Sequence, residues 1–507
     1  MTEGTTRFHL AILTGAGLAL TLVAGCNVGP KYQAPAPTAI TAPNYKESTV
    51  NFQDEEGWKV ADPQEGMLRG NWWEVFHEPE LNALEEQLNV DNQNIKISFE
   101  NFMAARATIN EARAQYWPTI TTSPSWNRSR TSANQRVTAV LNTGTTSSLW
   151  SLPVNATWTP DLWGKVRNQV SQATSTAQVS AADLELEKLT EQSLLAQYYF
   201  EIRGQDTLQK ILNDTVEADK SSLQYTQVQY DTGIGTYIAV TQARTTLASA
   251  QAAADAAVLL RAQYEHAIAM LVGKVATDFS VPARPMIYTP PPIPTGVPAQ
   301  LMERRPDVAA AERQLAAANA VIGIGYGAFF PNVTISAAGS LQSALAKHLF
   351  DIASRTWSIG PTASQTIFNG GLYRAALHQY TAVYNADLAA YRQTVLNAFE
   401  EVEDSLSATR IHSQEIAREQ EAVNAAQEYL DIAMERYKIG VDPYLNVIVA
   451  QNALLNAQAA LNSQQVSEMM SAVQLVQALG GGWNHTDLPT PDQLKAKPTK
   501  VDYARQQ

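Results

Sequence analysis

The chain has 507 residues, of which 45% are hydrophobic but only 17% are charged, and its formal net charge is −13. An average soluble protein has about 25% charged residues, so uncharged polar side chains take an unusually large share here. Because nucleic-acid binding requires a concentrated basic face, the acidic balance argues against a nucleic-acid partner. The single cysteine excludes a disulfide framework and a cysteine-based zinc site within one chain.

The N-terminus carries an apolar run from Leu10 to Ala24 that is followed by Gly25 and Cys26. About 15 apolar residues are too few to span a bilayer as a helix but suit the core of a signal peptide. Residues 1–25 resemble a bacterial lipoprotein signal peptide, which implies that Cys26 becomes the acylated first residue. By the same resemblance, Asn27 favours sorting to the outer membrane. The alternative is an ordinary signal peptide followed by a free cysteine.

Four uncharged windows show period-two alternation, which predicts strands near 119–128, 147–158, 332–341 and 356–368. One face of these strands is apolar and carries aromatic residues expected at lipid interfaces: Trp126, Trp150, Trp158 and Trp357. The other face carries Ser, Thr and Asn. A soluble sandwich also alternates, but its polar face normally carries Lys and Glu. The combination seen here is typical of an outer-membrane β-barrel with a wet lumen.

Four strands cannot close a barrel, since single-chain barrels begin at about eight strands. An unclosed edge leaves backbone groups without partners in lipid, so several copies must share one barrel. Two copies would give an eight-stranded barrel whose interior is filled by side chains, and small Ser and Thr residues fill space poorly. The composition therefore favours three copies.

Long proline-free stretches follow the strand windows, at 161–281, 362–442 and 444–488. Apolar residues spaced by three and four between Val395 and Tyr437 predict a coiled-coil helix, which would be on the order of 100 Å long if it ran from Gly371 to Ile439. An internal repeat is also present, with a constant offset of 207 residues. It relates Tyr230, Gly233 and Tyr237 to Tyr437, Gly440 and Tyr444.

The repeat predicts a duplicated unit in an α+β membrane protein. The expected order of elements in each copy is helix, strand, strand, long helix, tight turn, helix. We expect residues 26–280 to form the first copy and residues 299–480 the second. A proline-rich linker at 281–298 joins them, and 481–507 form a C-terminal tail. The strands then lie at one end of the molecule and the helix turns at the other.

Several short motifs occur in a fixed order along nearly the whole mature chain. They are Asn27-Val28-Gly29-Pro30-Lys31-Tyr32, Trp72-Trp73-Glu74-Val75-Phe76, Pro160-Asp161-Leu162-Trp163-Gly164-Lys165, Glu303-Arg304-Arg305-Pro306-Asp307-Val308, Arg436-Tyr437-Lys438-Ile439-Gly440 and Leu479-Gly480-Gly481-Gly482-Trp483. Together they resemble the TolC-like outer-membrane factor family, in its lipidated NodT-type branch.

The resemblance implies a homotrimer whose twelve strands form one barrel in outer-membrane lipid and whose helices form a long periplasmic tunnel. Its implied partners are a periplasmic membrane-fusion adaptor and an inner-membrane pump of the RND type. The implied function is a passive channel that exports small toxic compounds or drugs, with no enzymatic activity, no metal and no cofactor beyond the lipid on Cys26. It also implies a lipid-anchored protein of the outer membrane that extends into the periplasm.

The two predicted helix turns are explained physically by glycine caps. By resemblance they are also the tips that contact the adaptor, which gives these candidates: Gly233, Ile234, Gly235, Thr236, Gly440, Val441 and Pro443. The family gate lies just after the second tip, where Leu445 matches its apolar constriction. Val449 and Asn446 stand where family members carry Asp. Asp442 is the remaining acidic gate candidate, although helix capping also explains it.

Two further hypotheses about the function remain open. The same architecture serves as an exit duct for type I protein secretion or for heavy-metal efflux. The second hypothesis belongs to another class of function: a non-transporting structural lipoprotein built from coiled coils. The four alternating strands argue against it. The sequence has no GxSxG, HExxH or GxxxxGK[ST] motif, so no common catalytic or phosphate-loop signature is present.

Overall fold

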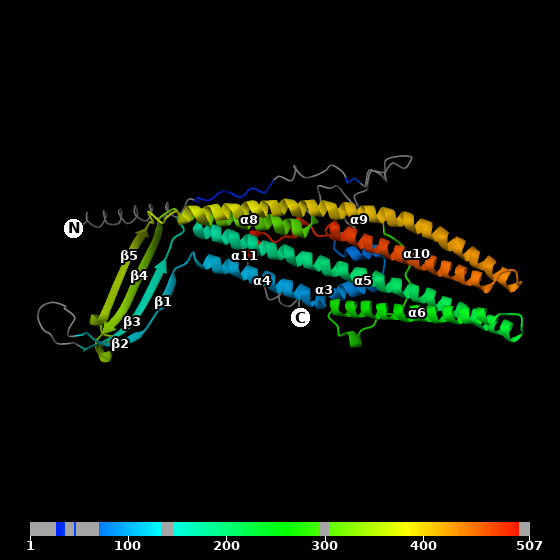
Figure 1. Ribbon diagram of the computed structural model, residues 1–507. Helices are drawn as coiled ribbons and strands as arrows, with labels where there is room; N and C mark the ends of the chain where they lie inside the picture. The colour runs from blue at the N-terminus through cyan, green and yellow to red at the C-terminus, as the bar shows by residue number, and fades with distance from the viewer. Residues whose placement is uncertain are drawn as a thin grey trace.

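The computed structural model describes residues 27–35, 45–46, 70–132, 146–291, 293 and 304–495. The protein is an elongated rod of helices with a small antiparallel sheet at one end (Figure 1). The turns that join the long helices lie at the opposite end of the rod. Cys26 and the whole predicted signal peptide lie outside the described residues.

The sheet contains β1 (Thr119–Thr122), β2 (Ser125–Arg130), β3 (Thr146–Trp158), β4 (Asn332–Ser343) and β5 (Arg355–Ser364). All neighbours are antiparallel, and the order across the sheet is β1–β3–β4–β5, with β2 also paired to β3. Because β1 and β2 follow each other along the same edge of β3, they occupy one strand position. The sheet thus has four positions, two from each half of the chain.

Two strand boundaries differ from the sequence prediction. The strand expected near 119–128 is split between β1 and β2 at Ser123 and Pro124, and proline cannot donate a ladder hydrogen bond. The strand expected to reach Phe368 ends at Ser364. Its partner β4 begins opposite Ser364 at Asn332, directly after Pro331, so the chain beyond Ser364 has no strand to pair with.

Within the described residues, both outer positions of the sheet lack a strand partner, β1 with β2 on one side and β5 on the other. Apolar side chains along it are exposed in the single chain, with 68% of Ile120, 70% of Ile359 and 81% of Trp357 accessible. An edge of this kind is a template for pairing with another strand. The outer strands of the sheet are therefore suited to pair with strands of another chain.

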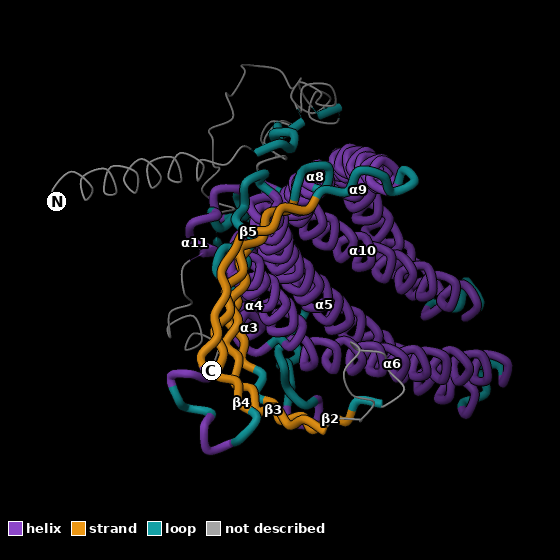
Figure 2. Tube along the Cα trace, turned by 90° about the vertical axis from the view of Figure 1, so that its left-hand side faces the viewer, coloured by secondary structure: helices purple, strands orange, loops and turns teal. Residues whose placement is uncertain are grey.

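Four long helices form two antiparallel pairs of matching length. Helices α5 (Lys165–Asp231) and α9 (Leu372–Lys438) each have 67 residues, and α6 (Tyr237–Leu271) and α10 (Tyr444–Ala478) each have 35. Figure 2 shows α5 with α6 and α9 with α10 as two arms that extend away from the sheet. The predicted rod from Gly371 to Ile439 differs from α9 by one residue at each end.

Shorter helices pack along the sheet-proximal half of this framework. They are α3 (Pro79–Asp91), α4 (Gln93–Ala114), α8 (Pro306–Gly327) and α11 (Pro491–Lys495), with 3₁₀ turns at Trp72–Phe76, Ala276–Asp278, Ala346–His348, Ile352–Ser354 and His485–Asp487. Helix α8 begins with Pro306 and carries Asp307 in its first turn, and both residue types favour the start of a helix. Among the described residues, none of the helices is both long enough and apolar enough to cross a membrane.

A hydrophobic core with several aromatic side chains lies midway along the rod, where the 3₁₀ turn at Trp72–Phe76 and α3 cover α5. Trp72 is fully buried, and Phe76 and Phe200 pack with ring centroids 5.1 Å apart. Beside this core, Arg203 of α5 is 2% exposed and donates to Asp206 at 3.0 Å. Asp206 also accepts from Arg261 of α6 at 2.5 Å and from the backbone N–H of Arg284 at 2.8 Å.

This arrangement predicts that Asp206→Ala will strongly destabilise the protein. The substitution leaves two arginines facing a site without their shared carboxylate, and breaking such a buried pair typically costs about 3–5 kcal/mol. The thermal midpoint of the purified protein measures the effect. Asp214→Ala, an exposed aspartate on the same helix, is the matched control, and equal midpoints for the two variants would contradict the structural role of Asp206.

Candidate functional site

The first helix turn joins α5 to α6 and contains four residues that the sequence analysis singled out, Gly233 to Thr236. Gly233 adopts φ +78°, a left-handed conformation that glycine tolerates best. The backbone N–H groups of Ile234 and Gly235 both donate to the carbonyl oxygen of Gln229, at 2.9 and 2.8 Å. Thr236 caps α6 by accepting from the N–H of Ala239 at 3.4 Å. The glycine cap expected here is confirmed.

The second turn, between α9 and α10, repeats the same backbone pattern. Gly440 adopts φ +77°. The N–H groups of Val441 and Asp442 donate to the carbonyl oxygen of Arg436, at 2.9 and 3.4 Å. Donors and acceptor correspond to those of the first turn at the same offset of 207 residues. Pro443 is the residue before the first turn of α10 and carries no side-chain cap.

The side chains of the two turns differ although their backbones match. A Cβ atom at Gly235 would lie 2.9 Å from Cβ of Gln229, so the first turn has no room for a side chain there. At the equivalent position of the second turn, Asp442 binds Arg436 through Nε at 2.6 Å and through Nη2 at 3.2 Å. The sequence analysis did not predict this ion pair.

Asp442 is therefore not the cap of α10, which corrects the capping explanation. Its side chain is directed to Arg436, and a hydrogen bond from that guanidinium holds the pKa of the carboxyl below its usual range. The carboxylate stays ionised at any physiological pH, but a cation of the same chain compensates its charge. An arginine and an aspartate six residues apart, on either side of a glycine turn, could have indicated this ion pair.

The tips are fastened to each other by a tyrosine cluster. The hydroxyl of Tyr437 donates to Oε1 of Gln229 at 2.6 Å and so joins the second tip to the first. The Tyr437 ring lies 5.2 Å from that of Tyr444 and 5.9 Å from that of Tyr225. Tyr437 and Tyr444, with Val447 and Ala243, form a buried cluster between the two arms. Relative movement of the arms must disrupt this cluster.

The gate candidates on α10 separate into two faces. Tyr444 and Val447 are buried against the neighbouring helices, whereas Leu445 and Val449 are 51% and 49% exposed. Since Leu445 and Val449 are four residues apart, they lie one turn apart on the same exposed face. Asn446 is half-buried beside the turn, where its N–H donates to the carbonyl oxygen of Pro443 at 3.1 Å. Leu445 and Val449 thus share one exposed face of α10, and the half-buried Asn446 lies at its border, three residues before Val449.

One buried carboxylate behind the tips was missed by the sequence analysis. Asp219 of α5 is 1% exposed, and neither of its carboxylate oxygens has a hydrogen-bond partner among the described residues. It lines a 290 Å³ cavity between α5, α6 and α10, together with Thr245, Ser249 and Gln451. Burial raises the pKa of Asp219 to about 6.

The tryptophans predicted for lipid interfaces all lie in the sheet. Trp126 and Trp150 face each other across β2 and β3 with ring centroids 5.7 Å apart. Trp158 lies at the helix-proximal end of β3, where its indole N–H donates to the carbonyl oxygen of Tyr116 at 2.9 Å. Trp357 stands opposite Gly339 on β4.

Comparison with known proteins decides the family. The family model for outer membrane efflux proteins matches residues 85–274 and 297–481, once in each half of the chain. The chain belongs to the outer membrane efflux protein family. It is 31% identical over 465 residues to the antibiotic efflux pump outer membrane protein ArpC of Pseudomonas putida, covering 91% of this chain and 94% of that protein.

A second relative and a solved structure agree with this assignment. The toluene efflux pump outer membrane protein TtgC of Pseudomonas putida is also 31% identical over 465 residues, with 91% of this chain and 94% of that protein covered. The structure of the outer-membrane channel OprN superposes with a TM-score of 0.80 at 28% identity. The superposition covers 90% of this chain and all of OprN (100%).

This outer membrane efflux protein is thus a transport component rather than a catalyst by family role. The predicted α+β membrane-protein fold and the outer-membrane location, with helices that extend into the periplasm, are confirmed. The predicted efflux-channel function is likewise confirmed by the family and its relatives.

Asp219→Asn is expected to stabilise the protein at neutral pH and to flatten its pH dependence. The folded-state pKa of Asp219 lies above the unfolded-state value near 3.9, so native stability falls as pH rises from about 4 to about 6 and is level above that. The amide removes the buried charge at every pH. Thermal midpoints between pH 4 and pH 8 measure the difference.

Asp214→Asn on the exposed face of α5 is the control and should leave the pH profile of the wild type unchanged. If Asp219→Asn and the wild type lose the same stability between pH 4 and pH 6, the unpaired buried carboxylate is not the titrating group.

Proposed function

We propose that three copies of this outer membrane efflux protein assemble into one channel. The observation that carries the proposal is the pair of open sheet edges, because unpaired strand edges are untenable in lipid. Four strand positions per copy give twelve in a trimer, and the uncharged hydroxylic face of the strands suits a wet lumen. The exposed apolar residues on α9 support the same assembly, since neighbouring copies would cover them: Val383, Leu396, Ile411, Tyr429 and Ile432.

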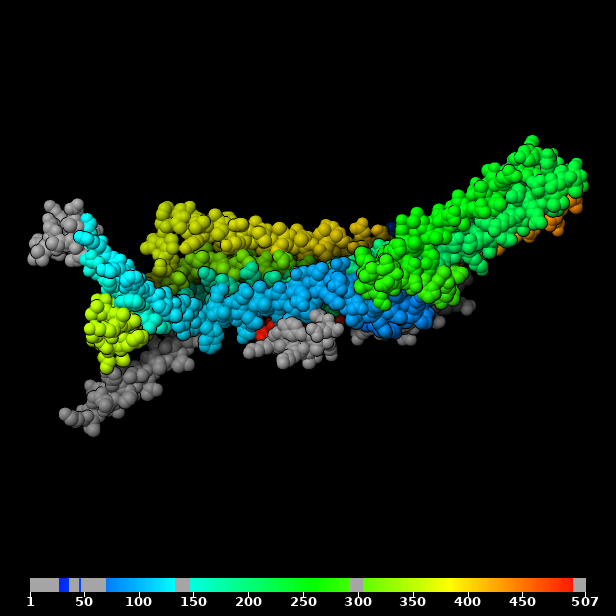
Figure 3. Space-filling model, turned by 90° about the horizontal axis from the view of Figure 1, so that it is seen from below, coloured from blue at the N-terminus to red at the C-terminus, as the bar shows by residue number. Residues whose placement is uncertain are grey.

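The helix tips are proposed as the docking surface for a periplasmic adaptor protein that couples the channel to an inner-membrane pump of the RND type. Ile234 is 81% exposed and Val441 57% exposed at the far end of the rod. Figure 3 shows the green end of the rod, where α5 turns into α6, projecting together with the orange α9–α10 end beyond the shorter helices, where a partner can reach both turns. Exposed apolar patches on a polar surface mark interaction sites.

Leu445 and Val449 are proposed to line the resting constriction near the tips. Both side chains are exposed in the single chain and lie on one face of α10, so three copies would place a small apolar ring around the axis. Asp442 adds little net negative charge to this region, because the guanidinium of Arg436 binds its carboxylate. With Val449 and Asn446 in place of carboxylates, we propose a constriction that closes by apolar contact rather than by an acidic ring.

A covalent lipid on Cys26 is proposed to anchor the N-terminus beside the sheet. The N–H of Val28 donates to the carbonyl oxygen of Trp163 at 3.4 Å, and Nδ2 of Asn168 donates to Asn27 at 3.1 Å. These contacts hold the start of the mature chain at the junction between sheet and helices. Multiple acyl chains at that point would be a stable anchor.

The exported compounds are proposed to be small toxic molecules such as drugs or solvents, as the names of ArpC and TtgC state for those relatives. Protein secretion and heavy-metal efflux remain the alternatives for this architecture. In the described residues, no group of three or more His, Cys, Asp or Glu side chains is placed to hold a metal ion. No enzymatic step is needed, because the energy would come from the inner-membrane pump.

Leu445→Ser should raise single-channel conductance in planar bilayers, because a shorter polar side chain widens and wets an apolar constriction. Ile439→Ser is the matched control: it is 74% exposed at the same tip but lies before the turn, so its conductance should equal that of the wild type. An unchanged conductance for Leu445→Ser would remove this residue from the gate.

Deletion of the gene should increase susceptibility to antibiotics, dyes or organic solvents, because the exit duct of the pump is lost. Minimum inhibitory concentrations for a panel of compounds measure the effect, with the wild-type gene on a plasmid as the control that restores resistance. If susceptibility to every compound stayed the same while a secreted protein accumulated in the cell, the drug-efflux assignment would be wrong.

A further inference from the structure

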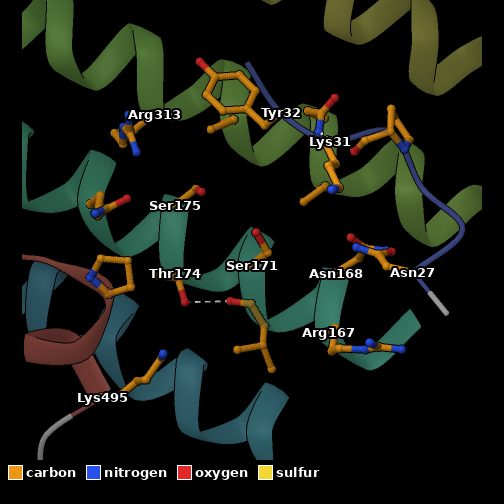
Figure 4. Close-up of a pocket in the computed structure, with 17 residues that line it drawn as sticks. Asn27, Lys31, Tyr32, Arg167, Asn168, Ser171, Thr174, Ser175, Arg313 and Lys495 are labelled. Carbon is orange, nitrogen blue, oxygen red and sulfur yellow. Dashed lines mark hydrogen bonds between the residues drawn. The ribbon is translucent and has the colours of Figure 1, made fainter. Parts of the chain in front are cut away.

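Two cavities in the helical rod differ in how their polar atoms are used. Beneath the sheet, a 480 Å³ pocket is lined by Lys31, Arg167 and Lys495, which lie on separate sides of it, and Thr174 bonds its own helix (Figure 4). Near the tips, the 290 Å³ cavity at Asp219 contains a carboxylate that is 1% exposed. Neither of its oxygens has a hydrogen-bond partner among the described residues. Because an uncompensated buried charge is costly, the cavity at Asp219 is the stronger candidate for a binding site.

The lining of the Asp219 cavity comes from three helices at one level of the rod. Asp219 of α5 and Ser249 of α6 lie the same number of residues from the turn that joins these antiparallel helices. From α10, Nε2 of Gln451 donates to Oγ of Ser222 at 3.4 Å, and Ser222 lies one turn from Asp219 on α5. The carboxylate and the polar groups of the other two helices therefore lie at the same height along the rod.

The neutral polar groups of the lining offer oxygen lone pairs to the cavity. Thr215, Thr245 and Thr246 each donate their hydroxyl proton to the backbone carbonyl oxygen four residues earlier in their own helix, at 2.9, 2.9 and 3.1 Å. A hydroxyl that donates in this way still has its two lone pairs. Gln451 is 8% exposed, and its Oε1 has no partner among the described residues. Acceptor oxygens beside a carboxylate are the ligands of a hard cation.

The charge of the cavity fits one monovalent cation. Asp219 is the one charged side chain among the described residues that line it. Its pKa of about 6 leaves it ionised above neutral pH. A divalent cation would leave an uncompensated positive charge inside the protein, since the lining holds one carboxylate. A single monovalent ion compensates the charge of Asp219.

The internal repeat indicates that helix packing does not require this carboxylate. Helices α5 and α9 have the same length and are related by the constant offset, so Ala426 of α9 is the equivalent of Asp219. The second arm thus has a methyl group where the first has a buried charge. A bound cation accounts for the charge in the first arm.

We propose that the Asp219 cavity binds a monovalent metal cation, sodium or potassium, with the Asp219 carboxylate as its charged ligand. Oxygens of the wall and water molecules complete its coordination, and the cavity has room for several waters, since each takes about 30 Å³ in the liquid. The family resemblance implies no metal, so this site departs from that expectation.

An ion in this cavity would contact α10 as well as α5 and α6, because all three helices line it. Its binding would therefore favour the arrangement of the two arms in this structure. The proposal goes beyond the channel function and rests on neither the gate nor the exported compound.

The test uses the full-length protein in detergent, at a pH above the pKa of Asp219. Sodium chloride replaces the chloride of the bulky cation N-methylglucammonium at constant ionic strength, and the thermal midpoint and the sodium NMR linewidth are measured. We expect the wild-type midpoint to rise with the logarithm of the sodium concentration above the dissociation constant, because the ion binds the folded protein. Potassium, magnesium and calcium chlorides are tested in the same way.

Two variants remove ligands, and each has a matched control. Asp219→Asn should abolish the sodium-dependent rise, whereas Asp214→Asn, at an exposed position of the same helix, should retain it. Thr215→Val removes one neutral oxygen and should weaken sodium binding about tenfold, the loss expected for one interaction with a charged group. Thr409→Val is its control, because Thr409 is half-buried and makes the same bond within α9.

The outcomes decide between a bound ion and water. A sodium or potassium response that Asp219→Asn loses and Asp214→Asn keeps supports the site, and the larger response identifies the ion. An equal response in the wild type and Asp219→Asn is a general salt effect and overturns the proposal. The absence of any response also overturns it, since the cavity then holds water only. A response to magnesium or calcium alone overturns the monovalent assignment.

The proposal stays testable if Asp219→Asn does not fold. The sodium NMR linewidths of Thr215→Val and Thr409→Val then decide, and equal linewidths overturn the ion site. Single-channel conductance and drug susceptibility report on the channel separately, so a failed ion site would leave the proposed function intact.

Discussion

The close approach of long helices through small side chains is the constraint on which the rest of this structure depends. At Gly204 of α5, an added Cβ would lie 2.4 Å from Val466 of α10, so the two halves of the chain touch where a side chain is missing. Along α6, the buried positions are largely alanine. Where helices pack this closely, small side chains at their contacts are sufficient, and long helices can run side by side with few charged residues.

Polar groups between these helices behave differently at two levels of the rod. Midway along the rod, Asp206 is satisfied by Arg203 and Arg261, and the site is a fixed joint between α5, α6 and the linker. Closer to the tips, Asp219 has no such partner and borders a cavity. Buried carboxylates of α5 are therefore of two kinds, one bound by two arginines and one without a hydrogen-bond partner among the described residues.

Much of this architecture could be predicted from the sequence because it is periodic. Alternation indicated the strands, and heptad spacing from Val395 to Tyr437 indicated a coiled-coil helix, whose expected bounds lie within one residue of those of α9. The constant offset revealed two equivalent turns. What could not be predicted depends on side chains that are distant in sequence. The hydrogen bond between Tyr437 and Gln229 and the burial of Asp219 without a hydrogen-bond partner arise only when separate elements meet.

The mismatch between the two turns has a consequence for symmetry. In a trimer, six helix turns with the same backbone would form a ring, yet every second one would carry an Asp442–Arg436 pair where its neighbours carry Gly235. The ring is sixfold in shape but threefold in chemistry. A partner assembly of six identical subunits would meet two kinds of contact in alternation, so its subunits would have to bind in two different ways.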